Sequence, residues 1–283
     1  MAKNEYILRA AAPDAIGILA DVASCVADHQ LSILKNEDFA DLDTGRFFIW
    51  QRLEAPEGHD LEPFKAAFGE LSAKRSIDWS IRPADEKPRI LVMVSKGDHC
   101  LIDLLYRARR DKLGAQIVAV VSNHENARWH AERHDVPFYH VPVTRETKPQ
   151  AEAQLHLLVD QYSADFVVLA RYMQVLSEDA VKALEGRCIN IHHSALPSFK
   201  GAKPYDQAHA RGVKMIGATA HYVTSDLDEG PIIAQETESV DHHHSARDLA
   251  EKGRDVEARV LSRAVTAHAE GRVFLNGVRT VVF

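Results

Sequence analysis

The chain contains little cysteine. Only Cys25, Cys100 and Cys188 occur among 283 residues, and they are odd in number and far apart in the sequence. This distribution fits a reducing compartment such as the cytoplasm, because it supplies neither a disulfide framework nor the paired spacing of a zinc site. We interpret all three as small buried apolar side chains, and we expect a cytoplasmic protein.

Long apolar runs and an excess of positive charge are also absent. No run approaches the roughly 20 residues that a transmembrane helix needs, and the N-terminal residues lack the apolar core of a signal peptide. The net charge of −7 argues against a general nucleic-acid binder. We therefore expect neither a membrane nor a nucleic acid among the partners. An apolar fraction of 46% in 283 residues is typical of a globular protein with room for two domains.

A glycine-rich phosphate loop is missing as well. Such a loop would follow the first strand of a nucleotide-binding fold. Residues 95–105 contain one glycine, Gly97, and match neither the Walker pattern nor GxGxxG. A helix that begins here favours an anion at its N-terminus, but the carboxylate of Asp98 opposes one. Dinucleotide binding is therefore a weak hypothesis.

Residues 1–84 are expected to form a small first domain. Hydrophobic alternation predicts strands near 6–12, 31–39, 46–53 and 77–81, and helical spacing predicts helices near 16–26 and 59–74. The order βαββαβ is that of a ferredoxin-like sandwich. With Pro13-Asp14 followed by Gly17, the segment resembles an ACT domain. That resemblance implies that Asp14 and Gly17 bind an amino-acid effector. An oligomerisation module and a helix N-cap at Asp14 are the simpler alternatives.

A charged, proline-bracketed linker at residues 82–88 leads into a second domain, which we place at 85–283. Strand patterns fall at 89–94, 116–122, 137–143, 165–170, 187–192, 216–223 and 232–240, with helical patterns between the first five. A long amphipathic helix is predicted at 245–270, and residues 273–283 are β-like. This alternation predicts a Rossmann-like α/β fold with a mostly parallel sheet.

Three polar side chains are candidates for catalysis. Asn190 and His192 end a predicted strand, where ligands collect in open α/β sheets, and Asp228 lies in an acidic turn further along the chain. An amide can donate to a carbonyl oxygen, an imidazole can stabilise an oxyanion, and a carboxylate can transfer protons. Each also has a structural alternative: a loop-capping Asn, a buried His and a turn-forming Asp. If burial dominates, the pKa of Asp228 should be raised.

Further residues are expected to form the binding pocket around these three. Tyr172, Met173 and Val175 can make an apolar wall for a planar ring, although Met173 can equally be a core residue. The full set of predicted binding residues is Arg171, Tyr172, Met173, Gln174, Val175, His193, Lys203 and Asp226. Supporting and core-packing roles stay open for His193 and His221. Three successive histidines, 242–244, suggest a metal site, but adjacent residues do not face one point, so we expect an exposed loop and no metal.

The motifs at 190–201 and 227–233 are Asn-x-His, Ser-x-Leu-Pro-x-Phe-x-Gly and Leu-Asp-x-Gly-Pro-Ile-Ile. They resemble the formyltransferase family that uses 10-formyltetrahydrofolate, and the resemblance assigns catalysis to Asn190, His192 and Asp228. The doubled His192-His193, together with the ACT-like segment, is similar to the formyltetrahydrofolate deformylases of that family. Further motifs that carry this similarity lie at 94–96, 99–101, 104–106, 122–124, 142–144, 169–174, 216–222, 253–257 and 276–283.

The resemblance implies a hydrolase. Water would be the second substrate, formate and tetrahydrofolate the products, and no cofactor would be needed. Formate would supply purine biosynthesis and the reaction would balance the one-carbon pool. The resemblance also implies a homo-oligomer with methionine or glycine as the effector. The chain departs from the family pattern at Ala12, Ala108, Ala195 and Asp206, and the last two put substrate affinity in doubt.

Two other functions stay open at this point. A formyltransferase that uses an amine acceptor, such as glycinamide ribonucleotide, would share the three catalytic residues. It would need a phosphate-binding loop that residues 96–99 lack. A non-catalytic regulator that senses folate is the second alternative, and the intact set of Asn190, His192 and Asp228 argues against it.

Overall fold

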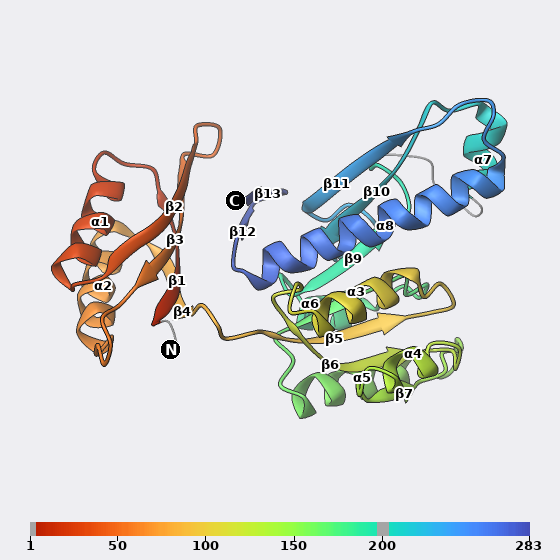
Figure 1. The fold of residues 1–283 in the computed structure, drawn as a ribbon, viewed down its shortest axis with the longest axis horizontal. Helices are drawn as coiled ribbons and strands as arrows, with labels where there is room; N and C mark the ends of the chain where they lie inside the picture. Colours follow the sequence, from red (N-terminus) through yellow and green to blue (C-terminus); the bar gives the residue numbers. More distant parts are fainter. Residues whose placement is uncertain (1–3, 197–203) are drawn as a thin grey trace. The chain divides into compact units, whose positions relative to one another are not determined.

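The structure is a computed structural model that describes residues 4–196 and 204–283. These residues form two compact units, whose elements are labelled in Figure 1. The first unit contains the chain up to Lys87, with Glu270–Asn276 and Val281–Phe283. The second contains Pro88–Ala269 and Gly277–Thr280. Within the described ranges, no helix combines the length and the apolar character needed to cross a bilayer.

The first unit has the predicted βαββαβ order. Its elements are β1 (Glu5–Pro13), α1 (Ile18–Asp28), β2 (Ser32–Asp41), β3 (Arg46–Glu54), α2 (Glu62–Arg75) and β4 (Asp78–Pro83). The strands pair in the order β2-β3-β1-β4, and every pair is antiparallel. Phe64 and Phe68 of α2 pack with Val22 of α1 and Leu8 of β1, which places both helices on one face of the sheet. The ferredoxin-like prediction is confirmed.

The C-terminal residues pack with the first unit, whereas we had placed the second domain at 85–283. Alternation along β3 turns Phe48 and Trp50 away from the two helices, and this face also needs cover. Phe274 provides it, with its ring centroid 5.6 Å from that of Phe48. Trp50 Nε1 also donates to the carbonyl oxygen of Glu270 at 3.1 Å. The predicted boundary is therefore corrected at the C-terminus.

A seven-stranded sheet forms the centre of the second unit. Its strands are β5 (Arg89–Val94), β6 (Gln116–Ser122), β7 (Phe138–His140), β8 (Phe166–Leu169), β9 (Cys188–His192), β10 (Met215–Tyr222) and β11 (Ile232–Ser239). They pair in the order β11-β10-β9-β8-β5-β6-β7. The pairs from β7 to β9 are parallel, and β10 runs antiparallel to both β9 and β11. The prediction of a mostly parallel sheet is confirmed.

Helices cover this sheet. They are α3 (His99–Arg109), α4 (Arg128–Glu132), α5 (Lys148–Gln161), α6 (Glu178–Ala183), α7 (Pro204–Arg211) and α8 (Ala246–Ala269). The long helix α8 lies along β10 and β11 and also packs against α3 (Figure 1). Leu155 and Leu158 of α5 pack against Val167 and Leu169 of β8. A two-stranded sheet of β12 (Val273–Asn276) and β13 (Arg279–Val282) ends the chain.

Candidate active site

Asn190 and His192 lie at the carboxyl end of β9. They are two residues apart, so strand alternation places both side chains on the same face. The strand runs between β8 and β10, and its register sets Leu169 and His221 opposite Asn190. Ile189 is fully buried, which anchors the strand in the core. The two polar side chains therefore project from a strand that is paired on both sides and anchored in the core.

Asp228 reaches the same place from the turn between β10 and β11. Its φ of 59° lies in the left-handed region, which Asp adopts more readily than most residues with a Cβ. The turn is pressed against β10, because a Cβ at Gly230 would lie 1.8 Å from the carbonyl oxygen of Tyr222. Glycine at position 230 thus allows the close approach that brings Asp228 to β9.

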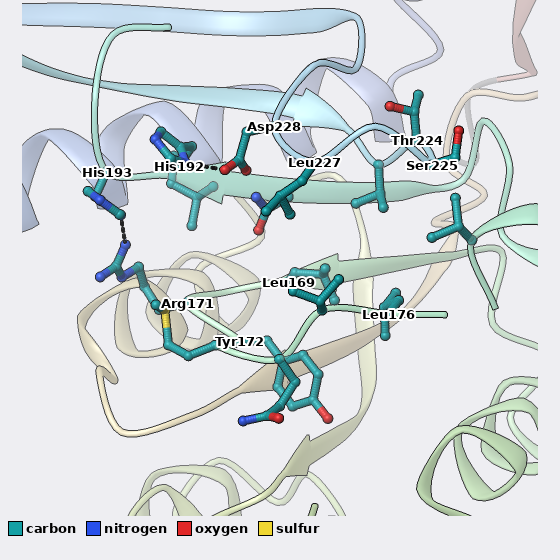
Figure 2. Close-up of a pocket in the computed structure, with 17 residues that line it drawn as sticks. Leu169, Arg171, Tyr172, Leu176, His192, His193, Thr224, Ser225, Leu227 and Asp228 are labelled. Atoms are coloured by element: carbon teal, nitrogen blue, oxygen red, sulfur yellow. Dashed lines mark hydrogen bonds and ion pairs between the residues drawn. The ribbon is translucent and has the colours of Figure 1, made fainter. Parts of the chain in front are cut away.

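Hydrogen bonds set the protonation of this group. His192 Nδ1 lies 3.2 Å from Asp228 Oδ2 (Figure 2). A carboxylate only accepts, so His192 donates through Nδ1 and its Nε2 is left for a ligand. This bond holds the pKa of Asp228 well below its ordinary value. Our expectation of a raised pKa was wrong, because hydrogen bonding outweighs burial at this half-buried carboxylate.

His221 completes the group, and sequence analysis had left its role open. Its Nδ1 lies 2.9 Å from the carbonyl oxygen of Tyr222, so Nδ1 carries a proton. Its Nε2 lies 3.2 Å from Asn190 Nδ2 and 3.6 Å from Asp228 Oδ1. Nε2 of His221 therefore accepts from the Asn190 amide, which keeps its second hydrogen for a ligand. His221 lies in the motif at 216–222, but its role depends on the pairing of β10 with β9, which no local pattern in the sequence reports.

These residues border a cavity of about 230 Å³. One wall is apolar: Met173, Val175 and Leu227 line the cavity and are 60%, 60% and 63% exposed. Of our two interpretations of Met173, the wall residue is therefore the one that the structure supports, and the core residue is not. Leu176 is half-buried and packs against the core. The site joins polar hydrogen-bonding groups at one end to an exposed apolar surface.

The structure brings most of the predicted binding residues together. Arg171, Tyr172, Gln174 and His193 also line the cavity. Burial raises the pKa of Tyr172 to about 12, so its hydroxyl stays protonated and can donate. Asp226 instead lines a neighbouring cavity with Glu178 and Lys182 among others. Lys203 lies outside the described residues.

The predicted effector residues lie in the first unit. Gly17 is the N-cap of α1 with a φ of 88°, a conformation that glycine adopts without strain. Asp14 precedes it in the loop, and its backbone N–H donates to the carbonyl oxygen of Gly45 at 2.8 Å. The helix N-cap is thus Gly17 rather than Asp14. Effector binding at these residues stays a prediction.

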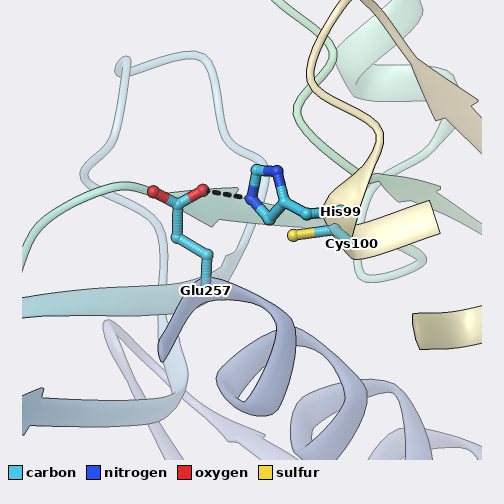
Figure 3. A group of neighbouring side chains, drawn as sticks. All are labelled: His99, Cys100 and Glu257. Carbon is cyan, nitrogen blue, oxygen red and sulfur yellow. Dashed lines mark hydrogen bonds and ion pairs between the residues drawn. The ribbon is translucent and has the colours of Figure 1, made fainter. Parts of the chain in front are cut away.

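A second polar group lies beside the cavity and contains His99, Cys100 and Glu257 (Figure 3). Glu257 is 1% exposed. Its carboxylate receives hydrogen bonds from His99 Nε2 and the Tyr205 hydroxyl, both at 2.7 Å, and Arg171 Nε lies 3.3 Å away. Burial raises the pKa of the Cys100 thiol well above its ordinary value. The geometry is that of an ion-paired network. Sequence analysis placed Glu257 in the motif at 253–257 but assigned it no role, because its contact with Arg171 joins residues far apart in the chain.

His242 and His243 form another group with Asp241. All three are exposed, and the Asp241 carboxylate accepts from the His243 backbone N–H at 2.9 Å. The same carboxylate also contacts the His244 ring, whose Nδ1 lies 2.8 Å from Asp241 Oδ1. The segment is an exposed turn before α8, as predicted.

Comparison with known proteins places this site in a family. Residues 88–265 match the family described as Formyl transferase. A formyltetrahydrofolate deformylase of Corynebacterium sp. (strain P-1) is 48% identical over 98% of this chain and 97% of its own. The crystal structure of a formyltetrahydrofolate deformylase from Pseudomonas putida KT2440 superimposes with a TM-score of 0.95 at 46% identity, over 99% of this chain and 100% of that one.

A more distant structure marks the contrast. Glycinamide ribonucleotide transformylase 1 from Symbiobacterium toebii is 30% identical with a TM-score of 0.65, and the match covers 70% of this chain and 94% of that one. The deformylases therefore match both units, whereas this transformylase matches a share of the chain close to that of the second unit alone. With its Asn190, His192 and Asp228 group at the end of β9, the chain belongs to the formyl transferase family and, within it, to the formyltetrahydrofolate deformylases.

Proposed function

We propose that this protein hydrolyses 10-formyltetrahydrofolate to formate and tetrahydrofolate. The observation that carries the proposal is the convergence of Asn190, His192 and Asp228 at one end of a cavity with an apolar wall. Formate released in this way supplies purine biosynthesis, and the reaction balances the one-carbon folate pool. Water is the second substrate, and the scheme uses only groups of this chain and its substrate.

The geometry supports a division of roles. Water attacks the formyl carbon, and the carbonyl oxygen becomes a tetrahedral oxyanion. Asn190 donates its second amide hydrogen to that oxygen, and His192 donates through Nε2 when it is protonated. Asp228 stabilises the protonated imidazole through the 3.2 Å contact with Nδ1. Removing one such oxyanion donor typically costs about 100- to 1,000-fold in rate.

Proton transfer completes the reaction. Asp228 accepts the proton of the attacking water and returns a proton to the folate nitrogen as the carbon–nitrogen bond breaks, which releases formate and tetrahydrofolate. The lowered pKa of Asp228 means that the carboxylate is ionised in the free protein at neutral pH. It therefore begins the cycle as an acceptor and passes its proton on readily rather than retaining it.

The cavity wall supports the substrate assignment. The exposed side chains of Met173, Val175 and Leu227 line the same cavity and form one apolar surface. Apolar residues gathered in this way indicate a binding site, whereas single exposed apolar residues do not. A flat ring system can cover them, and polar groups of Arg171 and Gln174 lie beside them to bind the ring edge. A pterin joins these properties, because it has apolar faces and hydrogen-bonding edges.

The Asp228→Asn variant tests the proposal. Asn tolerates the left-handed backbone at position 228, so the variant removes the charge and the proton acceptor without straining the turn. We expect formate release without any amine acceptor to fall at least about 100-fold, since proton transfer contributes on the order of 100- to 10,000-fold, while folate binding survives. Asp255→Asn, at an exposed position of α8, is the matched control. A nearly active Asp228→Asn would mean that another group transfers the proton.

The same assay decides between acceptors. Formate release by the purified protein with no amine present supports hydrolysis. Turnover that requires glycinamide ribonucleotide would instead establish a transferase and overturn our interpretation of residues 96–99. Tight folate binding with no formate under either condition would support a regulator.

The first unit supports a second part of the proposal: homo-oligomer formation and regulation by an amino acid. Strand β2 lies at the edge of its sheet and exposes Ile33, Leu34 and Phe39 by 40%, 48% and 46%. An apolar edge strand is a surface suited to association with a further copy. Methionine or glycine is the proposed effector near Asp14 and Gly17. Light scattering of the purified protein tests the oligomer. Adding each amino acid to the formate assay tests the effector. The cytoplasmic location stays a prediction.

A further inference from the structure

A chain of side-chain contacts connects the buried Glu257 to the catalytic pair. Glu257 Oε2 lies 3.3 Å from Arg171 Nε, and Arg171 Nη1 lies 3.0 Å from His193 Nδ1. The rings of His193 and His192 are stacked, with centroids 4.5 Å apart and planes inclined by 23°. His192 in turn contacts Asp228. Figure 2 shows Arg171 pointing at His193 from the loop after β8, on the side of His193 away from Asp228.

This chain determines which nitrogen of His193 carries a proton. A guanidinium group has only donors, so the nitrogen that faces it must accept. His193 Nδ1 is therefore unprotonated, and in the neutral ring the proton lies on Nε2. A second proton could enter only at Nδ1, where it would face the Arg171 donor. The contact thus selects one tautomer and opposes the charged form.

Arg171 is itself held in place. Its φ of 64° lies in the left-handed region, so the backbone turns sharply at Arg171 after the end of β8. Its partner Glu257 is 1% exposed and is fixed by His99 and by the Tyr205 hydroxyl, each at 2.7 Å. The carboxylate also balances the charge of the guanidinium, so that Arg171 adds little net positive charge beside the two stacked imidazoles.

We propose that Arg171, held by Glu257, fixes His193 as a neutral imidazole with its proton on Nε2, so that His192 is the member of the stacked pair that takes up a proton during catalysis. His193 then has two effects. It holds the plane of His192 by stacking, and it supplies a fixed Nε2–H donor at the cavity that it lines. His193 and Arg171 are in this sense positioning residues, and the inference rests on the proposed hydrolysis only for its catalytic consequence.

The charged and titratable groups that face His193 agree with this assignment. They are Arg171, His192, Glu257 and Asp228, and burial together with the first two lowers the pKa of His193 to about 4. The two carboxylates act in the opposite direction, and the combined effect of all these groups and burial is a lowered pKa. A neutral His193 is consistent with the geometry across the pH range in which a hydrolase assay is run.

Nitrogen-15 NMR of histidine-labelled protein tests the tautomer directly. Multiple-bond spectra distinguish a protonated Nε2 from a protonated Nδ1, and His193→Gln assigns the signal among the 16 histidines. We expect the Nε2–H tautomer of His193 from pH 5 to pH 8 without a charged form. An Nδ1–H tautomer, or a ring that becomes charged near its ordinary pKa of about 6.5, would overturn the proposal. This readout does not depend on activity, so it is informative even if the protein releases no formate.

The Arg171→Met variant tests the consequence. Without the guanidinium, His193 can accept a proton at Nδ1, so its signal should titrate between pH 5 and 8. We expect kcat to fall on the order of tenfold because His193 and His192 are misplaced. We also expect an added loss of kcat/KM at acidic pH, where His193 becomes charged. The double variant Arg171→Met/His193→Gln should lack that added loss. Arg171→Lys keeps the charge but cannot bridge both partners, and should restore only part of the rate. Arg109→Met, at an exposed arginine of α3, is the control.

Two results of the variant experiment would contradict the inference. An unchanged His193 signal in Arg171→Met would show that Arg171 does not set the tautomer. An added acid-side loss that persists in the double variant would assign that loss to a group other than His193. If Arg171→Met fails to fold, the wild-type spectrum and Arg171→Lys still decide.

Discussion

Replacing His221 with Phe should weaken catalysis by disordering Asn190. His221 is 2% exposed and its Nε2 lies 3.2 Å from Asn190 Nδ2, so Phe can fill the volume but cannot accept this hydrogen bond. Complete loss of an oxyanion donor costs about 100- to 1,000-fold. A donor that is loosened rather than removed should cost less, so we expect kcat/KM to fall about 10- to 100-fold, or roughly 1.4–2.7 kcal/mol.

The loss should not depend on pH. His221 Nε2 accepts from Asn190 and has no proton to donate to Asp228, whose pKa is held down first by the hydrogen bond from His192. Even the ordinary aspartate pKa of about 3.9 lies far below neutrality, and His192 still donates to the carboxylate. Asp228 therefore remains ionised, and the ratio of wild-type to variant activity should be the same at pH 6 and pH 8.

Stability should also fall. Phe cannot replace the Nδ1–H bond of His221 to the carbonyl oxygen of Tyr222, and the loss of one such hydrogen bond costs about 0.5–1.5 kcal/mol. Formate release at two pH values, with calorimetry for Tm, measures both effects, and His242→Phe at an exposed turn is the control. Full activity and an unchanged Tm in His221→Phe would refute the assigned contacts. A loss confined to pH 6 would show that protonation of Asp228, rather than the position of Asn190, limits the variant.

Two glycine substitutions test how the site is held. Gly230→Ala places a Cβ 1.8 Å from the carbonyl oxygen of Tyr222, so the Asp228 turn must move. We expect a loss of activity on the order of 100-fold, as for a misplacement of about 1 Å. Near-normal formate release would mean that the turn adjusts freely. Gly253→Ala places a Cβ 2.0 Å from the Tyr205 hydroxyl, which should displace Tyr205 from Glu257 and lower Tm by a few degrees, for a loss of about 1–2 kcal/mol; an unchanged Tm would show that Tyr205 contributes little.

Local patterns in the sequence were sufficient for most of the fold. Alternating and helical spacing located the strands of both sheets because burial imposes these periods on every element that has one face in the core. The helix predicted at 245–270 is observed at Ala246–Ala269 for this reason. The C-terminal residues were placed in the wrong unit because their partners, such as Phe48 and Trp50, lie more than two hundred positions earlier, and no local pattern reports such a contact.

The residues of the site also divide into those that a local pattern reveals and those that depend on tertiary contacts. Asn190 and His192 could be paired from sequence, since residues two apart on a strand share a face. The roles of His221 and Glu257 depend on which strands and helices are neighbours. Neither the antiparallel addition of β10 to β9 nor the packing of α8 beside α3 is encoded in a local period. Side chains that act through tertiary neighbours were therefore the ones that sequence analysis left open or missed.

Asp228 shows how such neighbours change the chemistry. Burial alone predicts a raised pKa for a carboxylate in a pocket, and a raised pKa would let it begin the reaction as a proton donor. His192 reverses the direction by donating a hydrogen bond to the carboxylate. The carboxylate must then begin the cycle as an acceptor, and the proton that stabilises the oxyanion has to be carried by an imidazole. The Arg171 contact that opposes charge on His193 directs that proton to His192, so the protonation of the whole site follows from which groups donate to which.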